Sequence, residues 1–174
     1  MLNVRGTGRH EKIPEADIDG THLPGGWYMV VSNHDGLELL DNYPQLRQLS
    51  EQAEVICCFV EEHVMFSAAS YWKNGQQVWS VRHDAQKGIE HLDMEGDLPP
   101  FFAKVRDEQR SKQITAGGNT AGVDYIFEIP VKLAESTTGY RHDISIPELA
   151  EFEILESIQA PPVLKAWWKK LTRR

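Results

Sequence analysis

The sequence predicts an α+β fold, in which a mixed or antiparallel sheet surrounds a central β-hairpin and helices pack against the sheet. Two apolar segments flank Asn74-Gly75, a residue pair that favours a tight hairpin turn because both central positions of a type I′ turn need positive φ. Short apolar runs typical of strands also alternate along the chain with segments of helical periodicity. The hairpin supplies at least one antiparallel strand pair, which excludes a purely parallel sheet.

The 174 residues fit one domain of ordinary size. Residues 1–26 are rich in glycine and charge and end at Pro24-Gly25-Gly26, so we expect an irregular N-terminal arm there. A single α+β domain is expected over residues 27–160, and a basic C-terminal helix is expected over residues 161–174.

The first part of the domain contains three segments with apolar character. They predict a strand over residues 27–32 and a helix, interrupted by a proline, over residues 37–50. The continuous apolar run within residues 54–62 is typical of a central strand that is covered on both faces. Cys57 and Cys58 lie in this run, so we expect buried free thiols rather than a disulfide.

The hairpin is expected to consist of strands over residues 64–73 and 76–83. Continuing the register from the turn pairs Ser70 with Trp79 and places Trp72 diagonal to Trp79 on one face of the sheet. The small residues before and at Ser70 leave room for a helix to pack closely against this strand.

We expect that helix to span residues 98–115, with Asp97 as its N-cap and two glycines at its end. A short strand is expected over residues 124–128. The next segment, residues 130–138, is expected to be a helix that stops at a glycine. A last strand is expected over residues 152–156.

The composition is acidic, with 26 acidic and 18 basic residues and a net charge of −8. General nucleic-acid binding is not expected, because affinity for phosphate comes mostly from Lys and Arg. An acidic surface attracts basic partners instead. We find no secretory signal and no apolar stretch of transmembrane length, so we expect a cytoplasmic protein without a transmembrane segment.

Three His-Asp dipeptides, at residues 34–35, 83–84 and 142–143, lie near the expected ends of elements. Imidazole nitrogens and carboxylate oxygens can hold a divalent metal that activates water, but Asp is also common in turns for its capping hydrogen bonds. Glu61-Glu62 lies at the same end of the hairpin as His83. The favoured interpretation is a polar, charged turn, and the alternative is that one of these carboxylates pairs with His83. The candidate binding residues are Glu61, Glu62, Trp72, Trp79, His83, Asp84, His142 and Asp143. The sequence indicates no cofactor and no catalytic residue, and it leaves metal ligands undetermined.

Four segments, residues 70–75, 79–84, 124–130 and 139–143, carry a resemblance to known proteins. Together they resemble a pattern found in small uncharacterised bacterial proteins. The resemblance covers residues 27 to about 143. It implies no assigned activity, so no catalytic residue follows from it.

Three functional hypotheses follow. The favoured one is a small acidic cytosolic binding protein, of the immunity or antitoxin type, that neutralises a basic protein partner, because the chain carries no complete catalytic motif. The alternative is a metal-dependent hydrolase that uses the His-Asp pairs at residues 83–84 and 142–143. The third is an adaptor whose basic, Trp-containing tail recruits a partner. An enzyme is not favoured, and the sequence determines neither the partner nor the oligomeric state.

Overall fold

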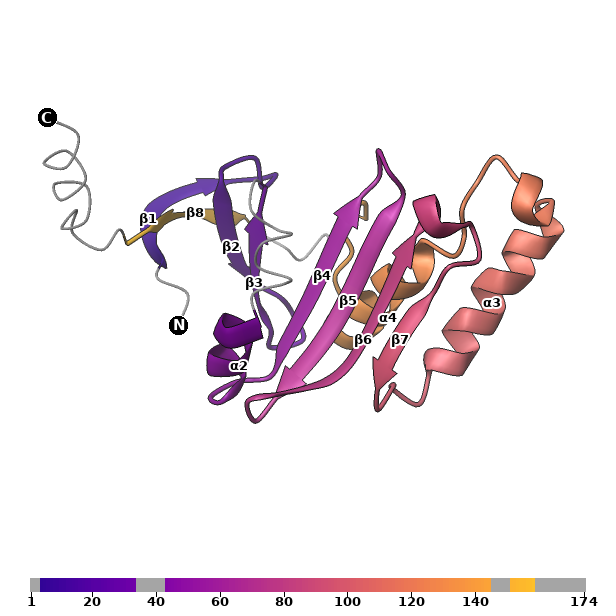
Figure 1. Ribbon diagram of the computed structural model, residues 1–174. Helices are drawn as coiled ribbons and strands as arrows, with labels where there is room; N and C mark the ends of the chain where they lie inside the picture. Colours follow the sequence, from indigo (N-terminus) through magenta and orange to yellow (C-terminus); the bar gives the residue numbers. More distant parts are fainter. Residues whose placement is uncertain (1–3, 34–42, 145–150, 159–174) are drawn as a thin grey trace, which may run out of the picture.

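Figure 1 shows the computed structural model, which describes residues 4–33, 43–144 and 151–158. These residues form two antiparallel four-stranded sheets and three α-helices, which confirms the predicted α+β class. The first sheet has the strand order β1 (Val4–Glu11), β8 (Phe152–Ser157), β2 (Ile18–His22), β3 (Tyr28–Ser32). The second has the order β4 (Val55–Glu61), β5 (Phe66–Lys73), β6 (Gln76–Asp84), β7 (Asp93–Gly96). The helices are α2 (Tyr43–Ser50), α3 (Phe102–Thr115) and α4 (Glu128–Thr138), with short 3₁₀ turns η1 (Ala85–Lys87) and η2 (Gly118–Thr120).

The expectation of an irregular arm over residues 1–26 is wrong, because this segment contains β1 and β2. Both strands pair with β8, which lies near the other end of the sequence. Gly6 of β1 lies directly against the carboxylate of Glu153 on β8, so a side chain at this position would displace that carboxylate. The glycines of the segment therefore allow close strand packing as well as turns.

The predicted hairpin is confirmed as β5 and β6, with positive φ angles of 53° at Asn74 and 73° at Gly75. The predicted register is wrong beyond the first pairs, because a β-bulge shifts it between Tyr71 and Trp72. Tyr71 consequently pairs with Trp79, and Ser70 pairs with Ser80. Trp72 and Trp79 therefore lie on opposite faces of the sheet rather than on one face.

The two faces of the β4–β7 sheet are covered by different helices, as Figure 1 shows. On one face α4 packs against β4, β5 and β6, and α3 packs against α4. The helix that uses the small residues of β5 is thus α4 and not the expected α3, and the Ser67 hydroxyl donates a hydrogen bond to the Phe127 carbonyl at 2.7 Å. On the other face α2 covers Trp72, which contacts Tyr43 edge to face.

Two segments before helices differ from the predictions. Residues 124–128 are not a strand, because the Asp124 carboxylate accepts hydrogen bonds from the backbone N–H groups of Ile126 and Phe127 and so begins the turn into α4. Asp97 does not cap α3, which begins at Phe102 without a side-chain cap. The helix over residues 130–138 is confirmed as part of α4, and it stops at Gly139 with a φ of 76°.

β4 is an edge strand and not the central strand that its apolar run predicts. It pairs with β5 on one side only, and its other side faces β3 of the first sheet (Figure 1). Three predicted features lie outside the described residues: the C-terminal helix, the first part of the helix expected over residues 37–50, and His34-Asp35. Among the described helices, none is long and apolar enough to cross a membrane.

The hairpin turn gives a direct test of this local structure. Gly75 has a φ of 73°, and a left-handed residue other than glycine costs about 1–2 kcal/mol. We expect Gly75→Ala to lower the free energy of unfolding by about that amount, as measured by urea denaturation. Gly122→Ala is the matched control, because Gly122 has ordinary φ and open space around its Cα, and it should change stability by less than about 0.5 kcal/mol. Equal effects of the two substitutions would contradict the type I′ turn.

Candidate functional site

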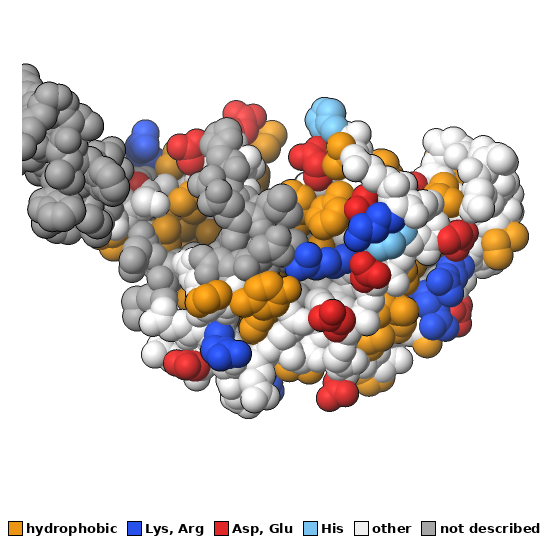
Figure 2. Space-filling model, in the orientation of Figure 1, with side chains coloured by type: hydrophobic (Ala, Val, Ile, Leu, Met, Phe, Trp, Pro, Cys, Tyr) orange, Lys and Arg blue, Asp and Glu red, His pale blue; other side chains and the backbone are white. Residues whose placement is uncertain are grey.

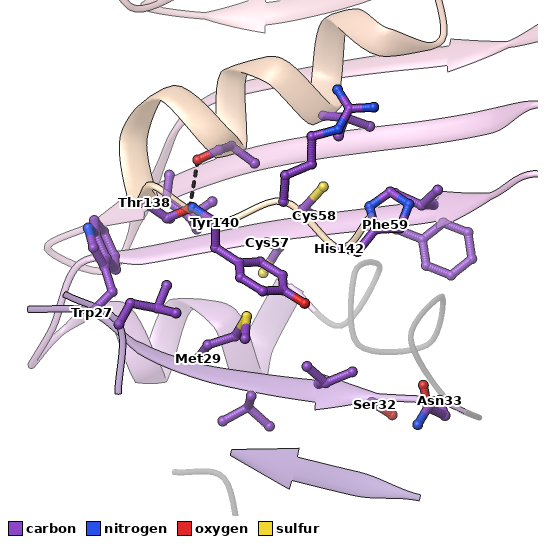
Figure 3. Close-up of a pocket in the computed structure, with 18 of the residues that line it drawn as sticks. Trp27, Met29, Ser32, Asn33, Cys57, Cys58, Phe59, Thr138, Tyr140 and His142 are labelled. Atoms are coloured by element: carbon purple, nitrogen blue, oxygen red, sulfur yellow. Dashed lines mark hydrogen bonds between the residues drawn. The ribbon is translucent and has the colours of Figure 1, made fainter. Parts of the chain in front are cut away.

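A cleft lies between the two sheets, with a volume of about 790 Å³. Its walls are two unbroken stretches of backbone, residues 27–33 on and beside β3 and residues 56–61 of β4. Val131, Ala134 and Thr138 of α4 line it as well, and Figure 3 shows these walls facing one another. The volume lies within the range of clefts that bind ligands, and most of the wall is apolar.

The cleft exists because both sheets end beside it. β3 is the last strand of the first sheet and β4 is the first strand of the second, and no strand pairing joins them in the described part of the chain. Residues Tyr28–Val31 and Val55–Val60 carry no charged side chain. Figure 2 shows hydrophobic side chains at the surface between the sheets, with acidic and histidine side chains at one end of this patch.

Cys57 and Cys58 line the cleft, so the expectation of two buried thiols is wrong for Cys58, which is exposed, while Cys57 is half-buried. The reason is that β4 is an edge strand. Neighbouring protein atoms still disfavour the charged thiolate by partial desolvation, which raises the pKa of Cys57 to about 11 and that of Cys58 to about 12. Both thiols therefore remain protonated at neutral pH and are poor nucleophiles.

Arg141 is the one Lys or Arg among the described residues that line the cleft, and its charge is neutralised by two carboxylates. Its guanidinium donates to both oxygens of Glu128, at 2.6 and 3.2 Å, and to Asp143 at 2.9 Å. These hydrogen bonds to Asp143 and Glu128 raise the pKa of Arg141, although partial burial alone would lower it. The same contact lowers the pKa of Asp143. This side of the cleft thus carries a paired cation with one surplus negative charge.

A second group of polar residues lies where β4 ends. Glu61 accepts a hydrogen bond from the backbone N–H of His63 and lies 3.0 Å from its Nδ1. Glu62 Oε1 lies 3.6 Å from His142 Nε2. Two of the predicted binding residues, Glu61 and His142, therefore line the cleft, and two more, Glu62 and Asp143, lie beside it through their contacts with His142 and Arg141. We call these four residues together with Arg141 and Glu128 the acidic rim, since it holds four carboxylates and one guanidinium.

His83 lies elsewhere, in the interior, and pairs with neither Glu61 nor Glu62, so the alternative interpretation of this turn is wrong. Its Nδ1 lies 2.7 Å from the His91 carbonyl and its Nε2 lies 2.9 Å from Asp124 Oδ2. Both partners are acceptors, so both ring nitrogens carry protons and the ring is an imidazolium. Burial alone would lower the pKa of His83, but the hydrogen bonds to Asp124 and to the His91 carbonyl outweigh it and raise the pKa.

The remaining candidates also have structural contacts. Asp84 Oδ1 accepts the backbone N–H of Gln86 and so caps η1. Trp72 and Trp79 are each 3% exposed and lie in the interior. The described residues contain no group of three or more His, Cys, Asp or Glu side chains that could hold a metal ion. The dipeptides at 83–84 and 142–143 are thus not joined into one ligand set.

The sequence did not indicate β3, Arg141 or the cysteines as parts of a site. The available signal was the absence of charge along two strands, which becomes informative only when both strands are known to be edges. The fold and the cleft define an α+β protein with an open, acidic-rimmed groove between two sheets. No protein-family model matches the chain, and comparisons with curated proteins and with solved structures gave no significant match.

Proposed function

We propose that this protein binds a basic partner protein in the cleft, in the manner by which an immunity or antitoxin protein neutralises its target. The observation that supports the proposal most is the cleft itself, because its walls are apolar and its rim has more carboxylates than cations. Apolar walls give affinity through burial, and rim charges increase the rate of association with a partner of opposite sign. The net charge of −8 acts in the same direction.

The hydrolase hypothesis has less support. Both nitrogens of His83 are used in hydrogen bonds, so neither has a lone pair for a metal. The thiols that line the cleft are protonated, which disfavours nucleophilic catalysis by Cys57 or Cys58. Binding needs neither a metal ligand set nor a nucleophile.

The test is site-specific photo-crosslinking in the native cells, with a photoreactive phenylalanine analogue at Phe59 in the cleft or, as control, at Ile114 on α3. Ile114 is 71% exposed and is not among the residues that line the cleft, so crosslinks from it report accidental encounters. We expect a basic protein to be crosslinked from Phe59 only. The purified partner should then bind in titration calorimetry, more weakly as salt increases.

A charge-reversal pair makes this test specific. Glu61→Lys with Glu62→Lys should weaken the complex about tenfold or more, because two rim carboxylates become cations. The control is the double substitution of Glu90→Lys with Glu95→Lys, which changes the net charge equally at exposed positions that do not line the cleft. It should weaken the complex less. Equal weakening by both pairs, or crosslinking from Ile114 alone, would refute binding at the cleft.

A further inference from the structure

The four edge strands of the two sheets are protected to different degrees. An exposed edge is a template for pairing with another chain, and proteins usually protect it with charges, bulges or short length. β1 has a register irregularity between Gly6 and His10 and carries charged residues. β7 has four residues, two of them acidic. Both outward edges of the molecule are therefore protected.

The two edges at the cleft have no such protection. β4 has seven residues without proline, and its first charged residue is Glu61 at the end of the strand. β3 has five residues with no charge and no proline. Both pair on one side only in the described part of the chain, and both line the same cleft over their length. Within the part of the chain that the structure describes, the two edges that face each other are therefore the ones without these protective features.

The side chains along β4 indicate what such a strand would contact. Neighbouring residues of a strand point to opposite faces, and Ile56 packs with the core on the α4 side. Cys58 and Val60 share that face, beside Ala134 and Thr138 of α4, which also line the cleft. A strand added to β4 would therefore place every second side chain on the α4 side of the sheet and the others on the opposite side.

We propose that the partner enters the cleft as an extended segment that pairs through its backbone with the free edge of β4. This inference rests on the proposed function and specifies its mode of recognition. The segment carries apolar side chains at alternate positions, which contact the cleft walls, and Lys or Arg at the end that lies over Glu61 and Glu62. Backbone pairing gives affinity, while the alternate side chains and the basic end give specificity.

The test uses the full purified chain and needs no knowledge of the natural partner. A display library of random ten-residue peptides is selected on the protein, and the best peptide is synthesised with a single N-methyl group at each position in turn. An N-methyl group removes one backbone donor and blocks pairing at that residue, so affinity should fall about tenfold or more at alternate positions only. Helical binding would instead give losses that do not alternate.

Amide hydrogen exchange measured by NMR gives the matching readout on the protein. Adding the peptide should slow exchange about tenfold or more at alternate amides between Ile56 and Val60, while exchange at amides of the protected edge β7 should not change.

Four results would each overturn strand addition: uniform N-methyl effects, unchanged exchange in β4, selection of no peptide above background, or dimerisation through β4 detected by sedimentation. If any of these results is obtained but a basic partner is still crosslinked from Phe59, strand addition fails while the proposed function stands. Alternating protection without a natural partner would support strand addition and refute only the choice of partner.

Discussion

Replacing Asp124 by alanine is expected to destabilise the fold by about 3–5 kcal/mol, because it leaves the buried imidazolium of His83 without its counter-charge. His83 is fully buried, and the Asp124 side chain is 8% exposed. Asp124 also accepts the backbone N–H groups that start α4, so alanine removes a cap together with the charge. Urea denaturation followed by circular dichroism measures the loss.

Asp124→Asn separates the two contributions. The asparagine carbonyl can still accept the capping hydrogen bonds, and its amide can donate to a neutral His83, so we expect a smaller loss of about 1–2 kcal/mol. Asp97→Ala is the control, since Asp97 is exposed and makes no capping contact with α3, and it should change stability by less than about 0.5 kcal/mol. A loss below about 1 kcal/mol in Asp124→Ala would contradict a buried ion pair.

The pH dependence of the pair has a defined sign. The pKa of His83 is raised above its ordinary 6.5, so its contribution is complete below that pH and is lost as pH rises through the raised pKa. For Asp124, burial opposes ionisation, but the hydrogen bond from His83 outweighs it and lowers the pKa below 3.8. Its contribution is therefore lost as pH falls through the lowered pKa. The difference in stability between the native chain and Asp124→Asn should be largest between about pH 4 and 6.5.

Structural features that depend only on neighbouring residues could be predicted from the sequence. Asn74-Gly75 determines its turn from two residues, and the glycine after α4 stops that helix, so both features could be predicted. β1 and β2 could not be predicted, because their pairing partner β8 lies more than a hundred residues away in the chain. The bulge beside Tyr71 changes the register by one residue and reverses the faces of all positions beyond it.

The site was predictable only in part, for the same reason. Residue type and position near element ends identified four candidates: Glu61, Glu62, His142 and Asp143. The structure places Glu61 and His142 in the cleft lining and the other two in contact with lining residues. The walls of the cleft depend on which strands are edges. An uninterrupted apolar run is equally compatible with a central strand and with an unprotected edge, so the pattern of β4 alone cannot distinguish a core from a binding surface.

A second large effect is expected at Asp19 on β2, which is fully buried in the first sheet. Neither of its carboxylate oxygens has a hydrogen-bond partner within the described part of the chain. Its neighbours in register are Val31 and Ile154, and burial, followed by the charge of Glu11, raises the pKa of Asp19 above 3.8. An acid with a raised pKa favours the native state when protonated, so its ionisation destabilises the fold as pH rises through that pKa.

Asp19→Asn is therefore expected to stabilise the protein at pH 7 by about 1–3 kcal/mol, because it removes a buried charge that the Glu11 carboxylate repels while preserving side-chain size. The gain should disappear below about pH 3.8, where the native aspartate is protonated as well. Glu95→Gln, at an exposed position on β7, is the control and should change stability by less than about 0.5 kcal/mol at either pH. Thermal and urea denaturation at pH 7 and pH 3.5 measure both differences. A gain of equal size at the two pH values would show that the charge of Asp19 is not the cause, whereas destabilisation at pH 7 would show that the carboxylate has a stabilising contact.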